Sequence, residues 1–233
     1  MAGFFGDSPS GTDPHGARGF PVMITFDDGW RGAVEIGGPI LESFGCRAFL
    51  FVATDFVGRR HFLSRSELQG VPQNLFYIGS HGRTHRLLNR LSDAEILEEL
   101  RASKAFLEDA IGNGVQALSI PGGAYDERVT RLAADTGYRY VFTSDVHVNR
   151  SGDISRTLGR VAIKSTTTAA AFRRYLRHRL GRERLRQWLL RAPKYWLGAG
   201  RYERLRRQLL GETAGQLDMQ DLSRWKNIRP VDR

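Results

Sequence analysis

The chain has 233 residues, a formal net charge of +10, 41% hydrophobic residues and 26% charged residues. This composition is close to that of soluble globular proteins and excludes a largely disordered chain. No apolar run reaches the roughly 18 to 20 residues that span a bilayer. Residues 1–20 lack the apolar core of a signal peptide, so we expect a cytoplasmic protein. The single cysteine, Cys46, excludes an intramolecular disulfide framework.

The positive charge is concentrated in the last third of the chain. Residues 1–154 contain 15 Lys and Arg against 19 Asp and Glu, whereas residues 155–233 contain 20 against 6. The larger part is therefore mildly acidic, and only the last segment is predicted to meet an anionic surface. We do not expect a nucleic-acid partner.

Short apolar runs bounded by turn residues alternate with helical patterns over most of the chain. The predicted strands are Val22–Phe26, Arg47–Ala53, Leu75–Ile78, Val115–Ile120, Tyr138–Thr143 and Ser155–Ile163. Between them, helices are predicted up to about Phe44, over Ser92–Ile111 with a capping box of Ser92 and Glu95, and over Arg128–Thr136. This alternation predicts an α/β fold with a parallel sheet or barrel, whose functional residues follow the strand ends.

Beyond Ser165 the sequence becomes basic and helical, without further strands. Helices are predicted over Thr168–Leu180, Glu183–Leu190 and Tyr202–Leu210. We therefore divide the chain into a lead (1–19), a main domain (20–164) and a basic helical C-terminal extension (165–233).

Two acids after the first strand and two histidines after the third form the main chemical signal. His81 and His85 are four residues apart, close enough to bind one ion, and a carboxylate from Asp27 or Asp28 would complete a His₂Asp site with an open position. Adjacent carboxylates resist being ionised together in a pocket. A bound dication would resolve this, with one Asp as ligand and the other as proton acceptor. Asp-Asp-Gly is otherwise a common turn, and an H-x-x-x-H pair is common by chance.

Three segments resemble motifs of the polysaccharide deacetylases, the NodB-homology group or carbohydrate esterase family four. Residues 25–29 match the T-F-D-D-G motif, and residues 80–85 resemble S-H-[ST]-x-x-H, with Gly82 in place of Ser or Thr. Residues 121–123 resemble the P-Y-G part of the third motif. The resemblance covers roughly residues 20–163.

This resemblance implies a distorted, incomplete (β/α) barrel and a metal-dependent hydrolase that removes N-acetyl groups from amino sugars. Carried over residue by residue, it makes Asp28, His81 and His85 the metal ligands and Asp27 the general base. The backbone N–H of Gly122 would stabilise the oxyanion. Zn²⁺ is the expected cofactor, with Co²⁺ or Ni²⁺ as alternatives, and an acetylated glycan is the expected substrate.

The sequence departs from the family pattern at three places. The arginine that often opens the third motif and orients the catalytic Asp is missing from residues 117–120, and the fourth motif is not recognisable around residues 144–147. The fifth motif lacks its histidine, the usual general acid, because the corresponding segment reads Leu158-Gly159-Arg160. His147 is a candidate substitute, although a loop histidine is more often simply solvated. Residues 160–163 resemble the exopolysaccharide-biosynthesis branch of the family.

Four further residues are predicted to border the substrate cleft. Trp30 offers an aromatic face on which a sugar ring can stack, although packing at the start of a helix explains it equally well. The others follow the fourth strand, and they are Pro121, Gly123 and Tyr125.

Other functions remain open on sequence grounds. An O-acetyl carbohydrate esterase would use the same fold and metal, and a degenerate family member would bind glycan without turnover. Non-haem iron oxygenases also use two His and a carboxylate, but the T-F-D-D-G context favours hydrolysis.

The basic extension has two interpretations. An apolar stripe of Phe172, Tyr175, Leu176 and Leu180 predicts a helix packed across the barrel. The surrounding arginines, with Trp188, Tyr195 and Trp196, instead favour peripheral attachment to the anionic inner face of a membrane.

Overall fold

The computed structural model describes residues 22–149 and 157–189. The chain divides into two compact units, Met1–Leu180 and Gly181–Arg233, and each is considered by itself. The domain boundaries drawn from the sequence stay a prediction. Among the described residues, no helix is both long and apolar enough to cross a bilayer.

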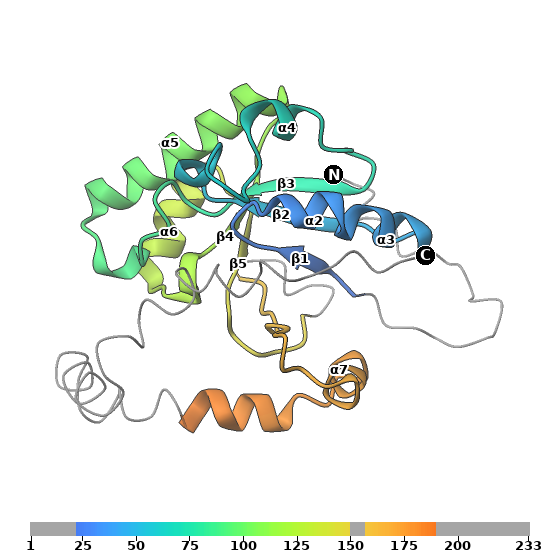
Figure 1. Ribbon diagram of the computed structural model, residues 1–233. Helices are drawn as coiled ribbons and strands as arrows, with labels where there is room; N and C mark the ends of the chain where they lie inside the picture. Colours follow the sequence, from blue (N-terminus) through green and yellow to red (C-terminus); the bar gives the residue numbers. More distant parts are fainter. Residues whose placement is uncertain (1–21, 150–156, 190–233) are drawn as a thin grey trace. The chain divides into compact units, whose positions relative to one another are not determined.

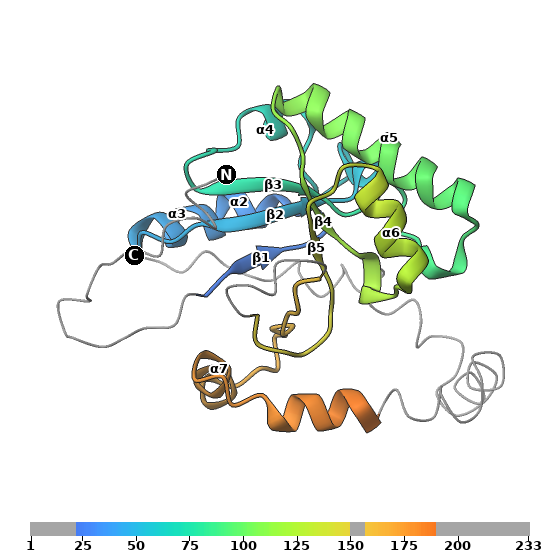
Figure 2. The same ribbon diagram turned by 180° about the vertical axis from the view of Figure 1, so that it is seen from behind.

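A five-stranded, wholly parallel sheet forms the centre of the first unit (Figures 1 and 2). Its strands are β1 (Ile24–Phe26), β2 (Ala48–Val52), β3 (Phe76–Ser80), β4 (Ala117–Ser119) and β5 (Tyr140–Phe142). The strands lie in the sheet in the order of the sequence, and each pairs in parallel with the next. Strands that follow one another in sequence order across the sheet are typical of a barrel, whereas the strand order of a doubly wound fold reverses. The predicted distorted, incomplete (β/α) barrel is therefore confirmed.

Helices connect the strands. The α-helices of this unit are α2 (Arg31–Glu35), α3 (Gly37–Ser43), α4 (Arg65–Gln69), α5 (Asp93–Ile111), α6 (Glu127–Asp135) and α7 (Ala169–Leu176), and the 3₁₀ turns are η1 (Thr54–Phe56), η2 (Leu88–Arg90) and η3 (Pro121–Gly123). The long helix α5 begins at the predicted capping box of Ser92 and Glu95 and ends at Gly112 in the left-handed conformation. Helix α6 lies next to α5 (Figures 1 and 2).

The sheet buries both of its faces, and alternate residues of the central strand β2 belong to two separate clusters. Ala48, Leu50 and Val52 of β2 join the large cluster with the helices. Phe49 and Phe51 join an inner cluster. The other buried members of this inner cluster are Ala117, Tyr140, Phe142 and Leu158. Because consecutive side chains of a strand point to opposite faces, the inner cluster marks the concave side of the curled sheet.

Gly79 shows how tightly the inner side is filled. A Cβ at Gly79 would lie 2.6 Å from the ring of Phe51 and 3.0 Å from the carbonyl oxygen of Ala117. The Phe51 ring therefore takes the space that a side chain at position 79 would need. The barrel interior at this level is a packed core, and functional side chains can gather only beyond the strand ends.

Two predicted elements differ from the structure. Residues 157–163 of the predicted last strand form no strand, but a single parallel bridge joins Leu158 to Phe142. The pairing stops because the N–H of Arg160 bonds to the carbonyl oxygen of Asp145 (2.9 Å), away from β5. The predicted helix Thr168–Leu180 ends at Leu176, and His178 has a left-handed φ of 55°.

The apolar stripe of α7 is only partly buried. Phe172 is 43% exposed and Leu176 is 39% exposed, while Leu180 beyond the helix is buried. Residues 181–189 form a helix at the start of the second unit, where Glu183–Leu190 was predicted. The predicted helix Tyr202–Leu210 lies outside the described residues, as do Tyr195 and Trp196.

Candidate active site

Four polar side chains continue the inward-facing rows of their strands past the carboxyl ends. Asp27 follows Thr25 of β1, His81 follows Gly79 of β3, and Ser119 ends β4. Arg160 stands two residues after Leu158, a member of the inner cluster. Because the period along a strand is two residues, all four belong to the inner side of the barrel. The parallel arrangement then gathers them at one end of the sheet.

The three residues predicted as metal ligands converge at this end. The Oδ1 atom of Asp28 lies 3.4 Å from Nε2 of His81 and 3.3 Å from Nε2 of His85. One nitrogen or oxygen from each of the three residues lies within 4.8 Å of the others. Ligand atoms of a tetrahedral zinc ion with bonds of about 2.0–2.2 Å are roughly 3.3–3.6 Å apart, which fits the two measured separations.

The surroundings of Asp28 and His81 leave one atom of each side chain available to a cation. Oδ1 of Asp28 is buried and has no hydrogen-bond partner among the described residues. His81 is 2% exposed, and its Nδ1 lies 2.7 Å from the carbonyl oxygen of Ser119. Because a carbonyl only accepts, Nδ1 carries the proton, and Nε2 presents its lone pair to the site when the ring is neutral. A buried carboxylate oxygen without a donor, facing two imidazoles, fits a divalent metal ion.

Asp27 has different partners from its neighbour. Arg160 binds it through two parallel hydrogen bonds, Nη1 to Oδ1 at 2.8 Å and Nη2 to Oδ2 at 3.0 Å. The hydroxyl of Ser119 also donates to Oδ2 (3.3 Å). Burial alone would raise the pKa of Asp27, but the charges of His81 and Arg160 and the hydrogen bonds from Arg160 and Ser119 hold that pKa below its usual range. Asp27 is therefore an ionised carboxylate beside the candidate metal site, with Oδ2 4.0 Å from Nε2 of His81.

Arg160 is the residue that sequence reasoning missed. Its guanidinium also donates to the hydroxyls of Ser119 (2.8 Å) and Thr25 (3.1 Å) and to the carbonyl oxygen of Thr143 (3.1 Å). It lies over the rings of Phe51 and Phe142. The arginine that often opens the third motif in the family is missing here, and Asp27 is bound by an arginine from the last segment of the barrel instead. The sequence did contain a sign of this residue, because an arginine stands where the fifth motif of the family has its histidine.

Two of the four described non-glycine residues with a positive φ are candidate ligands. Asp28 has a φ of 72° and His85 a φ of 62°, both in the left-handed region that side chains other than glycine rarely adopt. Such conformations cost on the order of 1–3 kcal/mol each and persist where the surrounding contacts determine them. The turn at Asp28 directs its carboxylate to the histidines, whereas Asp27 beside it faces Arg160.

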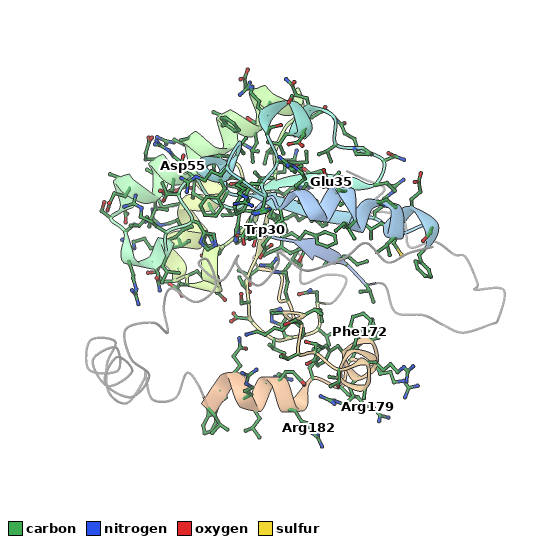
Figure 3. The ribbon with its side chains drawn as sticks, in the orientation of Figure 1. Trp30, Glu35, Asp55, Phe172, Arg179 and Arg182 are labelled. Carbon is green, nitrogen blue, oxygen red and sulfur yellow. The ribbon has the colours of Figure 1, made fainter. Side chains whose placement is uncertain are left out.

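Trp30 lies directly beside this site, at the N-terminal end of α2 (Figure 3). Its indole N–H donates to Oδ2 of Asp28 (3.2 Å), and its ring stacks on Phe62 with the centroids 4.3 Å apart. The N–H thus orients the candidate ligand while leaving Oδ1 for a cation. Both explanations offered by the sequence, packing at the helix start and a place near the substrate, are compatible with this position.

The residues after β4 form a tight turn. Pro121 and Gly123 are buried, and Gly122 and Gly123 both have a φ of 61°. A Cβ at Gly123 would lie 2.5 Å from the side chain of Ser144, so this turn is closely packed against the segment after β5. The hydroxyl of Tyr125 donates to Oδ2 of Asp145 (2.5 Å). Their roles toward a substrate stay predictions.

His147 packs against the last segment of the barrel. A Cβ at Gly159 would lie 2.4 Å from Nδ1 of His147, so the imidazole occupies the space next to that glycine. The neighbours of Gly159 face the other way, because Leu158 belongs to the inner cluster and Arg160 binds Asp27. The His147 ring is therefore packed against this segment, which does not favour it as the general acid.

The sequence comparisons agree with these motifs. A model of the polysaccharide deacetylase family matches residues 16–141, more than half of the chain. The chain belongs to the polysaccharide deacetylase family. It is also 27% identical over 155 residues to the Bacillus subtilis (strain 168) protein named "Putative polysaccharide deacetylase YxkH". This alignment covers 66% of the chain and 56% of YxkH, so the chain spans little more than half the length of this relative.

Solved structures of deacetylases share the fold. The deacetylase PplD from Streptococcus pyogenes, in complex with acetate, superposes with a TM-score of 0.60 at 21% identity, over 66% of this chain and 70% of PplD. The polysaccharide deacetylase BC0361 from Bacillus cereus gives a TM-score of 0.57 at 26% identity, over 67% and 51% of the two chains. These structures support the incomplete barrel of the polysaccharide deacetylases.

Removal of the arginine should change the titration of Asp27. In metal-free Arg160→Ala, we expect a higher pKa of Asp27, because burial remains while the paired charge and its hydrogen bonds are lost. In the wild type the lowered pKa stabilises the folded state above the unfolded-state pKa, and this stabilisation is lost as the pH falls through the folded-state value. ¹³C NMR titration, assigned with Asp27→Asn, measures the shift.

Arg128→Ala serves as the control, since Arg128 pairs with Asp93 and Asp126 on the helices. That variant should leave the Asp27 titration unchanged. An equal Asp27 pKa in Arg160→Ala and the wild type would contradict the structural role of the pair.

Proposed function

We propose that this polysaccharide deacetylase is a metal-dependent hydrolase that removes N-acetyl groups from amino sugars of a polysaccharide or its lipid-linked precursor, as in the exopolysaccharide branch of the family. The observation that carries this proposal is that the two adjacent acids, Asp27 and Asp28, have different partners. Asp28 faces two histidines with an unpartnered oxygen, while Asp27 is an ionised carboxylate held beside them by Arg160. A ligand set and a separate base are what metal-assisted hydrolysis requires.

The proposed reaction uses this division. A divalent ion, in our proposal Zn²⁺ with Co²⁺ or Ni²⁺ as substitutes, would be held by Asp28, His81 and His85 and would polarise the acetyl carbonyl and acidify a water molecule. Asp27 takes a proton from that water as its oxygen attacks the carbonyl carbon. The backbone N–H of Gly122 donates to the oxygen that becomes negative in the tetrahedral intermediate.

Collapse of the intermediate breaks the carbon–nitrogen bond and releases acetate and the amine. The nitrogen needs one proton, and we assign its delivery to Asp27, which has just received one from water. His147 is not chosen, because its ring packs on Gly159. The two hydrogen bonds from Arg160 keep the Asp27 carboxylate in one orientation for both transfers.

Acetate release from a panel of acetylated glycans tests the activity and its metal dependence. We expect release from N-acetylglucosamine oligomers, its loss after removal of metal by a chelator, and its recovery with Zn²⁺, Co²⁺ or Ni²⁺. Release only from O-acetylated xylan would instead identify an O-acetyl esterase, which uses the same metal chemistry. Glycan binding without release under saturating metal would identify a degenerate, non-catalytic member.

Two matched substitutions separate the base from the ligand. Asp27→Asn should retain metal and lose at least about 100-fold in turnover, because an amide cannot accept the proton of water. Asp28→Asn should weaken metal binding as well as turnover, because the ligand charge is lost. Metal content by elemental analysis and acetate release are measured on both. Equal loss of metal in the two variants would contradict the assignment.

The basic extension carries a second proposal, peripheral attachment to an anionic membrane face. In the helix of residues 181–189, the three apolar side chains Leu185, Trp188 and Leu189 are 57%, 64% and 55% exposed. Their spacing of three and four residues places them on one side of the helix. At 100° per residue, Arg182 and Arg186 flank one edge of this side, Arg184 flanks the other, and Glu183 and Gln187 lie opposite. This pattern is typical of interfacial helices.

Vesicle cosedimentation tests the attachment. We expect binding to anionic but not to neutral vesicles, since each basic residue near the surface contributes about 1 kcal/mol, and release on addition of salt. The variant Arg182→Gln, Arg184→Gln, Arg186→Gln should lose most of the binding, whereas Arg128→Ala on the barrel should retain it. A wild-type protein that ignores anionic vesicles at low salt would refute this proposal and leave the proposed hydrolysis unaffected.

A further inference from the structure

Glu99 is a buried acid for which the proposed reaction has no use. It lies in α5 and is 2% exposed. Its Oε2 accepts hydrogen bonds from the backbone N–H groups of Arg83 (3.0 Å) and Thr84 (2.9 Å). Its Oε1 accepts from the hydroxyl of Thr84 (2.5 Å) and the guanidinium of Arg86 (3.3 Å). All four bonds come from residues 83–86, the loop that carries His85.

The hydrogen bonds keep this buried carboxyl ionised. Burial alone would raise the pKa of Glu99, but the bonds from Thr84, Arg83 and Arg86 outweigh it and hold the pKa below the usual range. Hydrogen bonds to an ionised acceptor are shorter and roughly twice as strong as neutral ones. Glu99 is therefore a strong point of attachment between α5 and the loop.

The loop needs such attachment because its backbone is unusual. Gly82 has a φ of 74° and His85 a φ of 62°. On its other side, the loop carbonyls of Gly82 and Arg83 accept from the N–H groups of Thr54 (3.2 Å) and Asp55 (2.9 Å) of η1, where Figure 3 labels Asp55. The loop is thus held between η1 and α5. On the α5 side, the N–H groups of Arg83 and Thr84 both donate to the single carboxylate of Glu99.

Glu99 also lies next to Gly82, the residue at which this chain departs from the second motif. That motif has Ser or Thr at the position of Gly82, so its side chain is missing here. A Cβ at Gly82 would lie 3.6 Å from Oε2 of Glu99. The carboxylate from α5 thus lies against the backbone of the residue that lacks a side chain of its own.

We propose that Glu99 is a positioning residue of the candidate metal site, which holds the backbone of Arg83 and Thr84 so that the imidazole of His85 stays aligned with His81 and Asp28. This inference rests on the proposed metal site. It assigns Glu99 no contact with metal or substrate. Its effect reaches the site through residues 83–86 of the loop.

Metal affinity of Glu99 variants tests the inference. The dissociation constant for Zn²⁺ is measured by competition with a chromophoric chelator, and the visible absorption of the Co²⁺-loaded protein reports the ligand geometry. We expect Glu99→Ala to weaken Zn²⁺ binding on the order of 10- to 100-fold and to change the Co²⁺ spectrum. Glu99→Gln should recover most of the affinity, because its amide oxygen can still accept both backbone N–H groups.

Glu98→Ala is the matched control. Glu98 is the neighbour of Glu99 on α5 and pairs with the exposed guanidinium of Arg83 (3.2 Å), not with the loop backbone. It should bind Zn²⁺ as the wild type does. If Glu99→Ala does not fold, Glu99→Asp takes its place, since it keeps the charge but withdraws the carboxylate by one methylene. The same loss of affinity and spectral change are expected.

The outcomes separate this inference from the proposed function. A wild-type protein that binds no divalent metal would overturn the metal site and the role of Glu99 with it. A wild type that binds Zn²⁺, together with a folded Glu99→Ala or Glu99→Asp variant of equal affinity and unchanged Co²⁺ spectrum, would overturn only the positioning role.

Discussion

The candidate site depends on placing two adjacent carboxylates in different surroundings. Asp27 and Asp28 are consecutive residues, and like charges so close together would drive one of them to take up a proton. The structure separates them by a left-handed turn at Asp28, which sends one carboxylate to Arg160 and the other to the two histidines. The positive charge of Arg160 compensates the first. The second keeps a buried oxygen that accepts no hydrogen bond among the described residues and lies 3.4 and 3.3 Å from Nε2 of His81 and His85, an arrangement that fits a cation.

The regular geometry of the sheet brings the other parts together. Four strands or strand-like segments contribute one inward residue each, namely Asp27, His81, Ser119 and Arg160. Next to these residues, the inner side of the barrel is filled by Phe49 and Phe51 of β2 and Phe142 of β5, so the polar side chains lie against a packed aromatic cluster. The guanidinium of Arg160 lies over two of these rings, with its carbon 5.7 and 5.9 Å from their centroids, while it also binds Asp27. The core thus contributes to the orientation of the base.

The features that could be predicted from the sequence are those that neighbouring residues encode. The strand-end residues, the alternation of strands and helices and the capping box of α5 are short-range patterns. They predicted a parallel sheet or barrel and a site of His81, His85 and either Asp27 or Asp28, and the family resemblance then selected the incomplete barrel and Asp28. Arg160 was missed because its partner Asp27 is 133 residues away, and no local pattern records that pairing. The predicted strand around it was wrong for the same reason, since a tertiary bond to Asp145 diverts the backbone. Helix α7 ends early at a left-handed His178, which helical periodicity does not reveal.

The contacts around the candidate ligands show that the protein shapes this site by itself. Each ligand has a second partner on a different element: Ser119 of β4 holds His81, Trp30 holds Asp28, and Glu99 of α5 holds the loop of His85. Two of the three ligands also have strained backbones, which these contacts must maintain. A site whose ligands were placed by the ion alone would need no such partners. The free energy of arranging these donor atoms is therefore spent in folding, and a cation that entered would meet them already in place.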